Sequence, residues 1–406
     1  MTIVSQIELA IEFDYNDDLP ALLLNWTQAP QISGANLSMD AANRRQSAIR
    51  NAISRIKNTS NSPEQELVVL EALRADGYSY VTTFMVPDYT RMRHAELAAD
   101  RGDFETVELL FKEVQHPQFM MNAQLNKVFS EVVNTPEFEH WRDIRARYED
   151  WGQFWMEKSK NNPERLEPIY NLIGAYARLG QNAKAKNVIL SVLAEIDAGE
   201  SSYTDQYRYE NWFRDDYATL LYREGQVEEA FIQMRRGIGA GENGGANVSQ
   251  VLNLALAQCQ SGDPQKALTT LQIASPDRMS DYGRMVRSSI EVCIYSQLGD
   301  EAKVEHAIEY LETNSLDSWE NLLTAYLFAD RQPSAIKLLS EKLRSEKERS
   351  NALWHVQILE GDNDNYQSEF QELIETRKQA VIADPRVQSA IKQAGLRKRW
   401  PIASLY

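Results

Sequence analysis

Residues 169–190 read IYNLIGAYARLGQNAKAKNVIL, an apolar helix, a turn at Gly180 and a second helix. Four later stretches repeat this plan, and successive turn positions lie 45, 37, 37 and 31 residues apart. The later turn positions are Gly225, Gly262, Gly299 and Asp330. A period of roughly 20–50 residues is typical of repeat proteins, in which one unit cannot bury its apolar face without its neighbour. The stretch therefore predicts an array of paired helices.

Small and large side chains keep fixed places around these turns. Five residues after each turn stands a small side chain, at Ala185, Ala230, Ala267, Val304 and Ala335. A small residue there lets the second helix of a pair lie close to the first. Four residues before the turn, a large side chain recurs at Tyr176, Leu221, Tyr295 and Tyr326. This spacing predicts an all-α protein.

The spacing over residues 166–378 resembles that of the tetratricopeptide-repeat family. The resemblance implies a right-handed α-solenoid of helix–turn–helix repeats, whose first helices line a concave groove. The sequence departs from the family where Ile173 and Val292 replace its usual Gly or Ala, and where Asp330 replaces the turn glycine. These departures affect the family assignment more than the helix–turn–helix architecture.

A polar run, SKNNPE at residues 159–164, is the expected hinge between the two halves of the chain. We therefore predict a helical region of degenerate repeats at residues 1–158. The tetratricopeptide-like array follows at residues 159–378. A basic capping helix and tail complete the chain at residues 379–406.

The first region carries weaker helical signals. We expect helices near residues 3–13 and 19–26, and turns at Gly77 and Gly102. Residues 78–86 are rich in side chains that favour strands. Because tertiary context often overrides such propensities, we expect a helix there, with a short strand as the alternative.

Two segments resemble the closing helices of such arrays. Residues 383–402, ADPRVQSAIKQAGLRKRWPI, are similar to the segment that follows tetratricopeptide arrays in some bacterial signalling proteins. Residues 135–155 share its order of a proline, an apolar residue and a basic amphipathic helix. The resemblance implies that each segment closes an array and that the chain works in bacterial signalling or regulation.

The charge distribution argues against nucleic acid as a partner. The chain has 43 basic and 59 acidic residues and a formal net charge of −16, and an acidic surface repels phosphate backbones. From residue 376 onward, seven basic side chains stand against Asp384 alone. We expect this basic tail to dock onto the acidic body of the same chain.

Targeting signals and cysteine use point to one compartment. The N-terminus lacks the features of a signal peptide, and no apolar run approaches the roughly 18 residues of a membrane span. Cys259 and Cys293 are expected on the first helices of adjacent repeats, about 8–10 Å apart, so we predict buried thiols without a disulfide. These features predict a cytoplasmic protein, although a fragment of an anchored or larger protein would look the same.

Short motifs that suggest a metal or cofactor lack the context that their chemistry needs. Residues 239–244, GAGENG, match a dinucleotide-binding loop but follow a helix, so we expect a loop between repeats. Residues 362–366 resemble the start of a calcium loop without its glycine, and we expect a polar turn. His306 and Glu309 share a helix face but supply too few ligands for a metal. We predict no metal, no cofactor and no catalytic residues.

The predicted function is binding. Groove-facing positions in the family's frame include aromatic and arginine side chains, which dominate interface hot spots. These positions are Tyr170, Arg178, Trp212, Tyr222, Arg223, Gln260, Gln297 and Phe328. One subtype of the family holds acidic tails with Lys and Asn side chains. This chain has Asp215 and Thr219 at corresponding positions, so a partner of basic character suits it better. We predict a non-catalytic scaffold for a segment of a protein or peptide partner.

An enzyme on a closed helical toroid, such as a carbohydrate-active one, is the alternative. The 8 Trp and 18 Tyr residues support it, because aromatic side chains stack on sugar rings. Such an enzyme needs two acidic residues that flank a glycosidic bond, and no sequence pattern marks such a pair.

Overall fold

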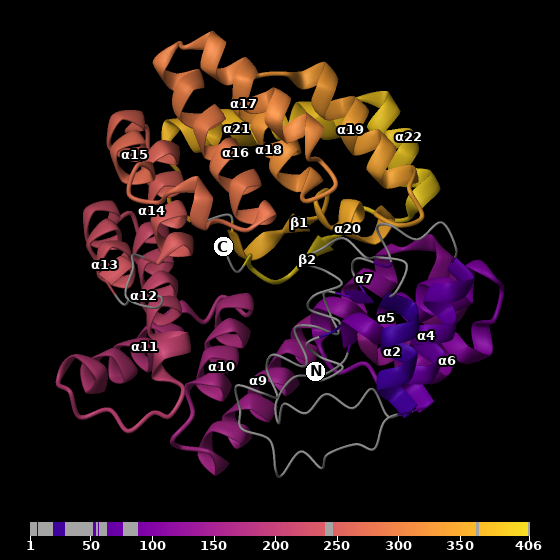
Figure 1. Cartoon of the computed structure of the whole chain (residues 1–406). Coiled ribbons are helices and arrows are strands. Elements are labelled where there is room, and N and C mark those ends of the chain that lie inside the picture. The colour runs from indigo at the N-terminus through magenta and orange to yellow at the C-terminus, as the bar shows by residue number, and fades with distance from the viewer. Residues whose placement is uncertain are drawn as a thin grey trace. The chain divides into compact units, whose positions relative to one another are not determined.

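The structure is a computed structural model that describes residues 6, 19–28, 52–53, 56, 63–75, 88–239, 247–362 and 365–404 (Figure 1). In these residues nearly all regular structure is helical, which confirms the all-α prediction. Two short strands, β1 (Ile358–Leu359) and β2 (Arg399–Trp400), pair in parallel.

The expectations for the N-terminal region meet the structure only in part. The helix expected near residues 19–26 is α2, Leu19–Gln28. The expected turn at Gly102 is present with a φ of 74°. The predicted turn at Gly77 and residues 78–86 lie outside the described residues, as does the helix near residues 3–13 apart from residue 6, which is helical.

Contacts divide the chain into two compact units. The first comprises Met1–Ile144, Ser345–Trp354 and Ala394–Leu396; the second comprises Arg145–Arg344, His355–Gln393 and Arg397–Tyr406. Both units combine segments that are distant in the sequence, so this division differs from the predicted boundaries after residues 158 and 378. The expected hinge at 159–164 begins inside a helix, because α9 spans Ile144–Asn161.

The first unit is a cluster of short helices around an aromatic core. Its helices are α2, α4 (Pro63–Ala75), α5 (Asp88–Asp100), α6 (Phe104–Lys112), α7 (Pro117–Leu125), α8 (Ser130–Val133) and α20 (Arg349–Trp354). The rings of Phe129, Phe138 and Trp141 lie 5.0 to 6.0 Å from that of Phe111. Although α20 comes late in the chain, it packs against α7 and completes this unit.

The second unit contains the helices of the predicted array. They are α9, α10 (Leu166–Arg178), α11 (Asn182–Asp197), α12 (Gln206–Arg223), α13 (Val227–Gly239), α14 (Val248–Gln260), α15 (Pro264–Leu271), α16 (Asp281–Leu298), α17 (Glu301–Thr313), α18 (Trp319–Phe328), α19 (Gln332–Arg344), α21 (Glu369–Ala383) and most of α22 (Pro385–Ala394). From α10 to α19 each helix contacts the next, and α14 and α18 also contact α16 (Figure 1). The predicted helix pairing around the five turns is confirmed.

All five turn positions adopt the left-handed conformation that commonly ends a helix. The four glycines have φ values between 69° and 84°, and Asp330 has a φ of 55°. Among the described residues, Asp330 is the one non-glycine with positive φ, and Asp tolerates this region better than most side chains. The turn geometry is therefore kept where the glycine is missing.

The predicted small positions are buried. Ala185, Ala230, Ala267, Val304 and Ala335 are each 0 or 1% exposed. Among the large positions, Leu221 and Tyr326 are buried, and Tyr176 and Tyr295 are half-buried. The sequence pattern thus identified the contact face within each helix pair.

The prediction of two separate thiols is wrong, because Cys259 of α14 and Cys293 of α16 form a disulfide. Their Cα atoms lie 6.4 Å apart, inside the usual range of about 4.4–6.8 Å. The separation of about 8–10 Å applies to helix axes. Facing Cα atoms on two such helices come closer, because each lies about 2.3 Å from its own axis.

The predicted docking of the basic tail onto the body is confirmed for Arg377 and Arg397. Arg377 donates from Nη1 to the carbonyl oxygens of Leu327 and Phe328, both at 2.8 Å, and pairs with Asp330 at 3.4 Å. Arg397 donates from Nε to the Val356 carbonyl at 2.8 Å. The helix expected in this tail is α22.

Two of the remaining sequence motifs lie partly outside the described residues. Gly239 is the last residue of α13, and residues 240–246 lie outside the described part. Asp362 ends a 3-10 turn, and residues 363–364 are not described. Among the helices that the structure describes, none has the length and apolar character needed to cross a membrane.

Candidate functional site

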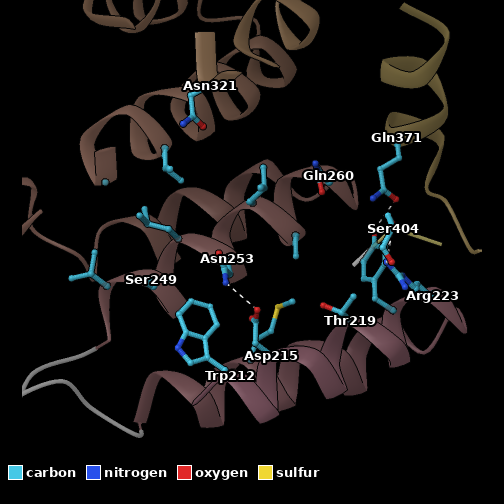
Figure 2. A pocket seen from close by; sticks show the side chains of 18 of the residues that line it. Trp212, Asp215, Thr219, Arg223, Ser249, Asn253, Gln260, Asn321, Gln371 and Ser404 are labelled. Carbon is cyan, nitrogen blue, oxygen red and sulfur yellow. Dashed lines mark hydrogen bonds between the residues drawn. The ribbon is translucent and has the colours of Figure 1, made fainter. Parts of the chain in front are cut away.

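A cavity of about 890 Å³ lies within the second unit (Figure 2). Its walls come from α12, α13, α14, α16 and α18, and from segments near residues 362–371 and 404. This volume falls within the range of about 300–1,000 Å³ that is typical of ligand-binding sites.

One face of α12 forms a wall of the cavity. Trp212, Asp215, Thr219 and Tyr222 line it at intervals of three or four residues, which is the spacing of neighbours on one helix face. Figure 2 shows Trp212 and Asp215 on the same side of α12, with a hydrogen bond from Asn253 on α14 reaching Asp215. The first helices of two successive pairs thus face each other across this space.

Asp215 is the most unusual group in the cavity. Its side chain is buried, and the residue is only 4% exposed. Asn253 Nδ2 donates to Oδ2 at 3.1 Å, whereas Oδ1 has no hydrogen-bond partner among the described residues. Burial raises the pKa of Asp215 to about 6, and the hydrogen bond from Asn253 opposes that rise. An unpaired buried acceptor of this kind costs about 1–3 kcal/mol, so these surroundings are unfavourable for the ionised carboxylate of Asp215.

The lining of the cavity is partly aromatic and apolar. Trp212 is half-buried, and Tyr282, at the start of α16, is 60% exposed. Met234 and Leu252 are buried side chains of the lining. A carboxylate beside aromatic surface is a combination that recognises cations.

The opposite end of the cavity is occupied by the C-terminal segment of the same chain, which here means the described residues from 362 to 404. Figure 2 shows Arg223, Gln371 and Ser404 together at this end. Arg223 Nη2 donates to the Ser404 carbonyl at 3.2 Å and to Ser404 Oγ at 2.9 Å. Tyr222 donates from its hydroxyl to Gln371 Oε1 at 3.0 Å. Two predicted groove residues therefore hold an internal segment.

The C-terminal segment also covers the ends of four first helices. The last carbonyls of a helix have no partner within it. Here the Arg178 and Arg223 carbonyls accept from the backbone N–H groups of Ala403 and Tyr366, both at 2.9 Å. The Gln260 carbonyl accepts from Ser368 Oγ. The Phe328 carbonyl accepts from the guanidinium of Arg377.

Other predicted groove residues lie away from the cavity. The Tyr170 ring packs 5.5 Å from Tyr209 and 6.1 Å from Phe213 in a hydrophobic cluster. Phe328 is 2% exposed and stacks on Phe370 at 6.0 Å. Both therefore contribute to packing.

Gln297 and Arg178 contact their own chain as well. Gln297 Nε2 donates to the Cys259 carbonyl at 2.9 Å and lies 3.0 Å from its sulfur. Arg178 is buried and donates from Nη1 to the Ala403 carbonyl at 3.0 Å. Of the eight predicted positions, four line the cavity: Trp212, Tyr222, Arg223 and Gln260.

Sequence reasoning did not identify Asp215 as a binding residue. An acidic side chain at helical spacing usually belongs to a solvated face. The sequence feature that pointed to Asp215 was its helical spacing: it follows Trp212 by one turn and lies on the same helix face as Thr219. The folded chain brings Asn253 of α14 to Asp215 and leaves Asp215 only 4% exposed.

The second acidic residue of the lining has an internal role. Both carboxylate oxygens of Asp362 accept from the Ser404 backbone N–H, at 2.9 and 3.1 Å. Glycoside hydrolysis needs two acidic groups that flank the scissile bond, and Asp362 instead contacts its own chain. The enzyme on a helical toroid stays a prediction.

Neither the family models nor the curated proteins that were compared with the chain match it.

Proposed function

We propose that this chain is a non-catalytic binding module of the tetratricopeptide-like, right-handed α-solenoid class, which holds a segment of a partner protein in the cavity beside α12. The observation that carries the proposal is the cavity of about 890 Å³ with Trp212 in its wall and a buried carboxylate oxygen of Asp215 left without a partner. A bacterial signalling or regulatory role remains the setting that the family resemblance suggests.

The position of the cavity supports a peptide ligand. It lies against the first helices of successive pairs, the surface that solenoid proteins use for extended partners. The chain's own C-terminal segment lies across the ends of the same helices and is held partly through backbone hydrogen bonds at 2.9 Å. This surface is therefore suited to a polypeptide in a non-helical conformation.

The test is selection of ligands from a random peptide library displayed on phage, with the purified full chain as bait. Affinities of the selected peptides are then measured by isothermal titration calorimetry. Trp212→Ala should weaken binding by roughly 30-fold, as expected for an aromatic hot spot. Tyr207→Ala is the matched control, because this residue is on the same helix, is 70% exposed and does not line the cavity.

The two variants separate cavity binding from surface adhesion. Binding within twofold of the wild type is expected for Tyr207→Ala. If selection yields no peptide, or if the selected peptides bind Trp212→Ala as tightly as the wild type, the proposal is rejected. Circular dichroism of both variants confirms that the fold is intact.

A further inference from the structure

We propose that Asp215 and Trp212 form a subsite for the ammonium group of a lysine side chain. This inference rests on the proposed function, since the lysine belongs to the bound partner segment. It names a chemistry for the part of the cavity that the C-terminal segment leaves open.

Asp215 is a buried carboxylate in the wall of the cavity. Burial of a carboxylate is unfavourable unless a cation or several donors compensate it. Of the described residues that line the cavity, Arg223 alone is cationic, and it lies two helical turns away and contacts Ser404. No ion pair to Asp215 occurs among the described residues. A ligand cation would supply the missing charge.

An aromatic side chain lies on the same helix face as the carboxylate. Trp212 precedes Asp215 by three residues and projects from the same face of α12 (Figure 2). Indole is the aromatic group that attracts cations most strongly. A cation bound to the Asp215 carboxylate would therefore have a negative charge and an aromatic ring in reach. An anionic ligand would meet a buried carboxylate and is disfavoured.

The hydrogen bonding of Asp215 distinguishes lysine from arginine as a ligand. Guanidinium binds a carboxylate best through two parallel hydrogen bonds, one to each oxygen. At Asp215, Oδ2 already accepts from Asn253 at 3.1 Å and Oδ1 is buried, so the two oxygens are not both open to a guanidinium. An ammonium group needs just one such oxygen, so the site favours lysine over arginine.

The test uses three small probes and the intact chain. They are the Nα-acetyl methylamides of lysine, arginine and norleucine, which differ at the end of the side chain. Binding is measured by saturation-transfer NMR titration. We expect the lysine probe to bind about tenfold more tightly than the norleucine probe, and more tightly than the arginine probe, because one charged hydrogen bond is worth roughly a factor of ten or more.

Two variants connect the binding to this subsite. Asp215→Asn keeps the shape and removes the charge, and it should reduce the affinity for the lysine probe about tenfold. Trp212→Leu should reduce it about threefold and provides a second measure if Asp215→Asn does not fold. Tyr207→Ala should leave it unchanged. Equal binding of lysine and norleucine probes, tighter binding of arginine, or no effect of Asp215→Asn would overturn the inference.

The outcome is separable from that of the proposed function. If library peptides depend on Trp212 but not on Asp215 or on a lysine, the peptide-binding function stands and the ammonium subsite is refuted. If the lysine probe binds through Asp215 while no library peptide binds, the subsite stands and the peptide-binding function fails.

Discussion

The Asp215→Asn substitution is expected to stabilise the protein at neutral pH while it removes the binding subsite. In the wild type, burial raises the pKa of Asp215 from 3.8 to about 6. The native state therefore binds this proton more tightly than the unfolded state does. The free energy of unfolding of the wild type should then decrease as pH rises through the window from about 4 to about 6, and stay level above it.

The magnitude follows from the size of this shift. One pKa unit corresponds to about 1.4 kcal/mol, so a difference of about two units corresponds to about 3 kcal/mol. Asn cannot ionise and escapes this cost, although its amide group adds a donor that costs about 1–2 kcal/mol when unpaired. We expect a net gain of about 1–2 kcal/mol at pH 7, and a loss of similar size at pH 4.

The assay is denaturation by urea at pH 4, 5, 6 and 7, followed by circular dichroism. Amide hydrogen exchange of α12 and α14 assigns the measured transition to the second unit. The decisive quantity is the difference in unfolding free energy between variant and wild type, compared at pH 4 and pH 7. It should change by about 3 kcal/mol between these two pH values. Packing costs that do not depend on pH cancel from this comparison.

The control is Glu200→Gln, which removes one acidic charge at an exposed residue outside the cavity. Its stability difference should vary by less than about 0.5 kcal/mol over the same range. If the Asp215→Asn difference is equally flat, then Asp215 is solvated in the native state and the reasoning about the cavity is wrong.

Three further predictions concern the elements around the cavity. Replacing Arg377 by Ala removes the donor to two helix-end carbonyls and should speed amide exchange in α21 by about tenfold or more. Arg386→Ala should leave it unchanged, because Arg386 is exposed and pairs with Asp384, a near neighbour in sequence. Replacing Cys259 and Cys293 together by Ala should lower the unfolding free energy by about 4 kcal/mol, because the disulfide closes a loop with a sequence separation of 34. Equal midpoints of urea denaturation for the wild type with and without a reductant would refute this. Gly180→Ala should cost about 1–2 kcal/mol, because the φ of 69° there is unfavourable for a side chain, and a variant as stable as the wild type in urea would contradict the left-handed turn.

The disulfide also bears on the predicted compartment. Disulfides persist mainly in oxidising environments and are rare in the cytosol. A cytoplasmic location would therefore require that Cys259 and Cys293 be present there as thiols. Alkylation of free thiols in the native cell, followed by mass spectrometry of the two peptides, distinguishes these states.

The helix pairs could be predicted because their signals are local. Glycine or aspartate at a turn, a small residue five positions later and a large one four positions earlier all act within one helix–turn–helix unit. Ala185 and Ala335 are 0% exposed, as this local logic requires. A chain segment of about 20 residues is long enough to carry the pattern.

The candidate site could be predicted only in part. Trp212 and Tyr222 were identified from their place in the repeat, and both line the cavity. Tyr170 and Phe328 occupy corresponding kinds of position but pack against Tyr209 and Phe370. The repeat pattern specifies which face of a helix points toward the groove, but not which neighbour fills the space in front of it.

The sequence by itself therefore determined the all-α class, the helix pairs and the small residues at their contacts, because these depend on periodicity along the chain. Tertiary structure alone decided the Cys259–Cys293 disulfide, the burial of Asp215 and the contacts of the C-terminal segment. These depend on side chains brought together from positions 34, 38 and 149 residues apart. Burial and hydrogen bonding respond to proximity in space, and the folded chain creates that proximity where the sequence pattern is silent.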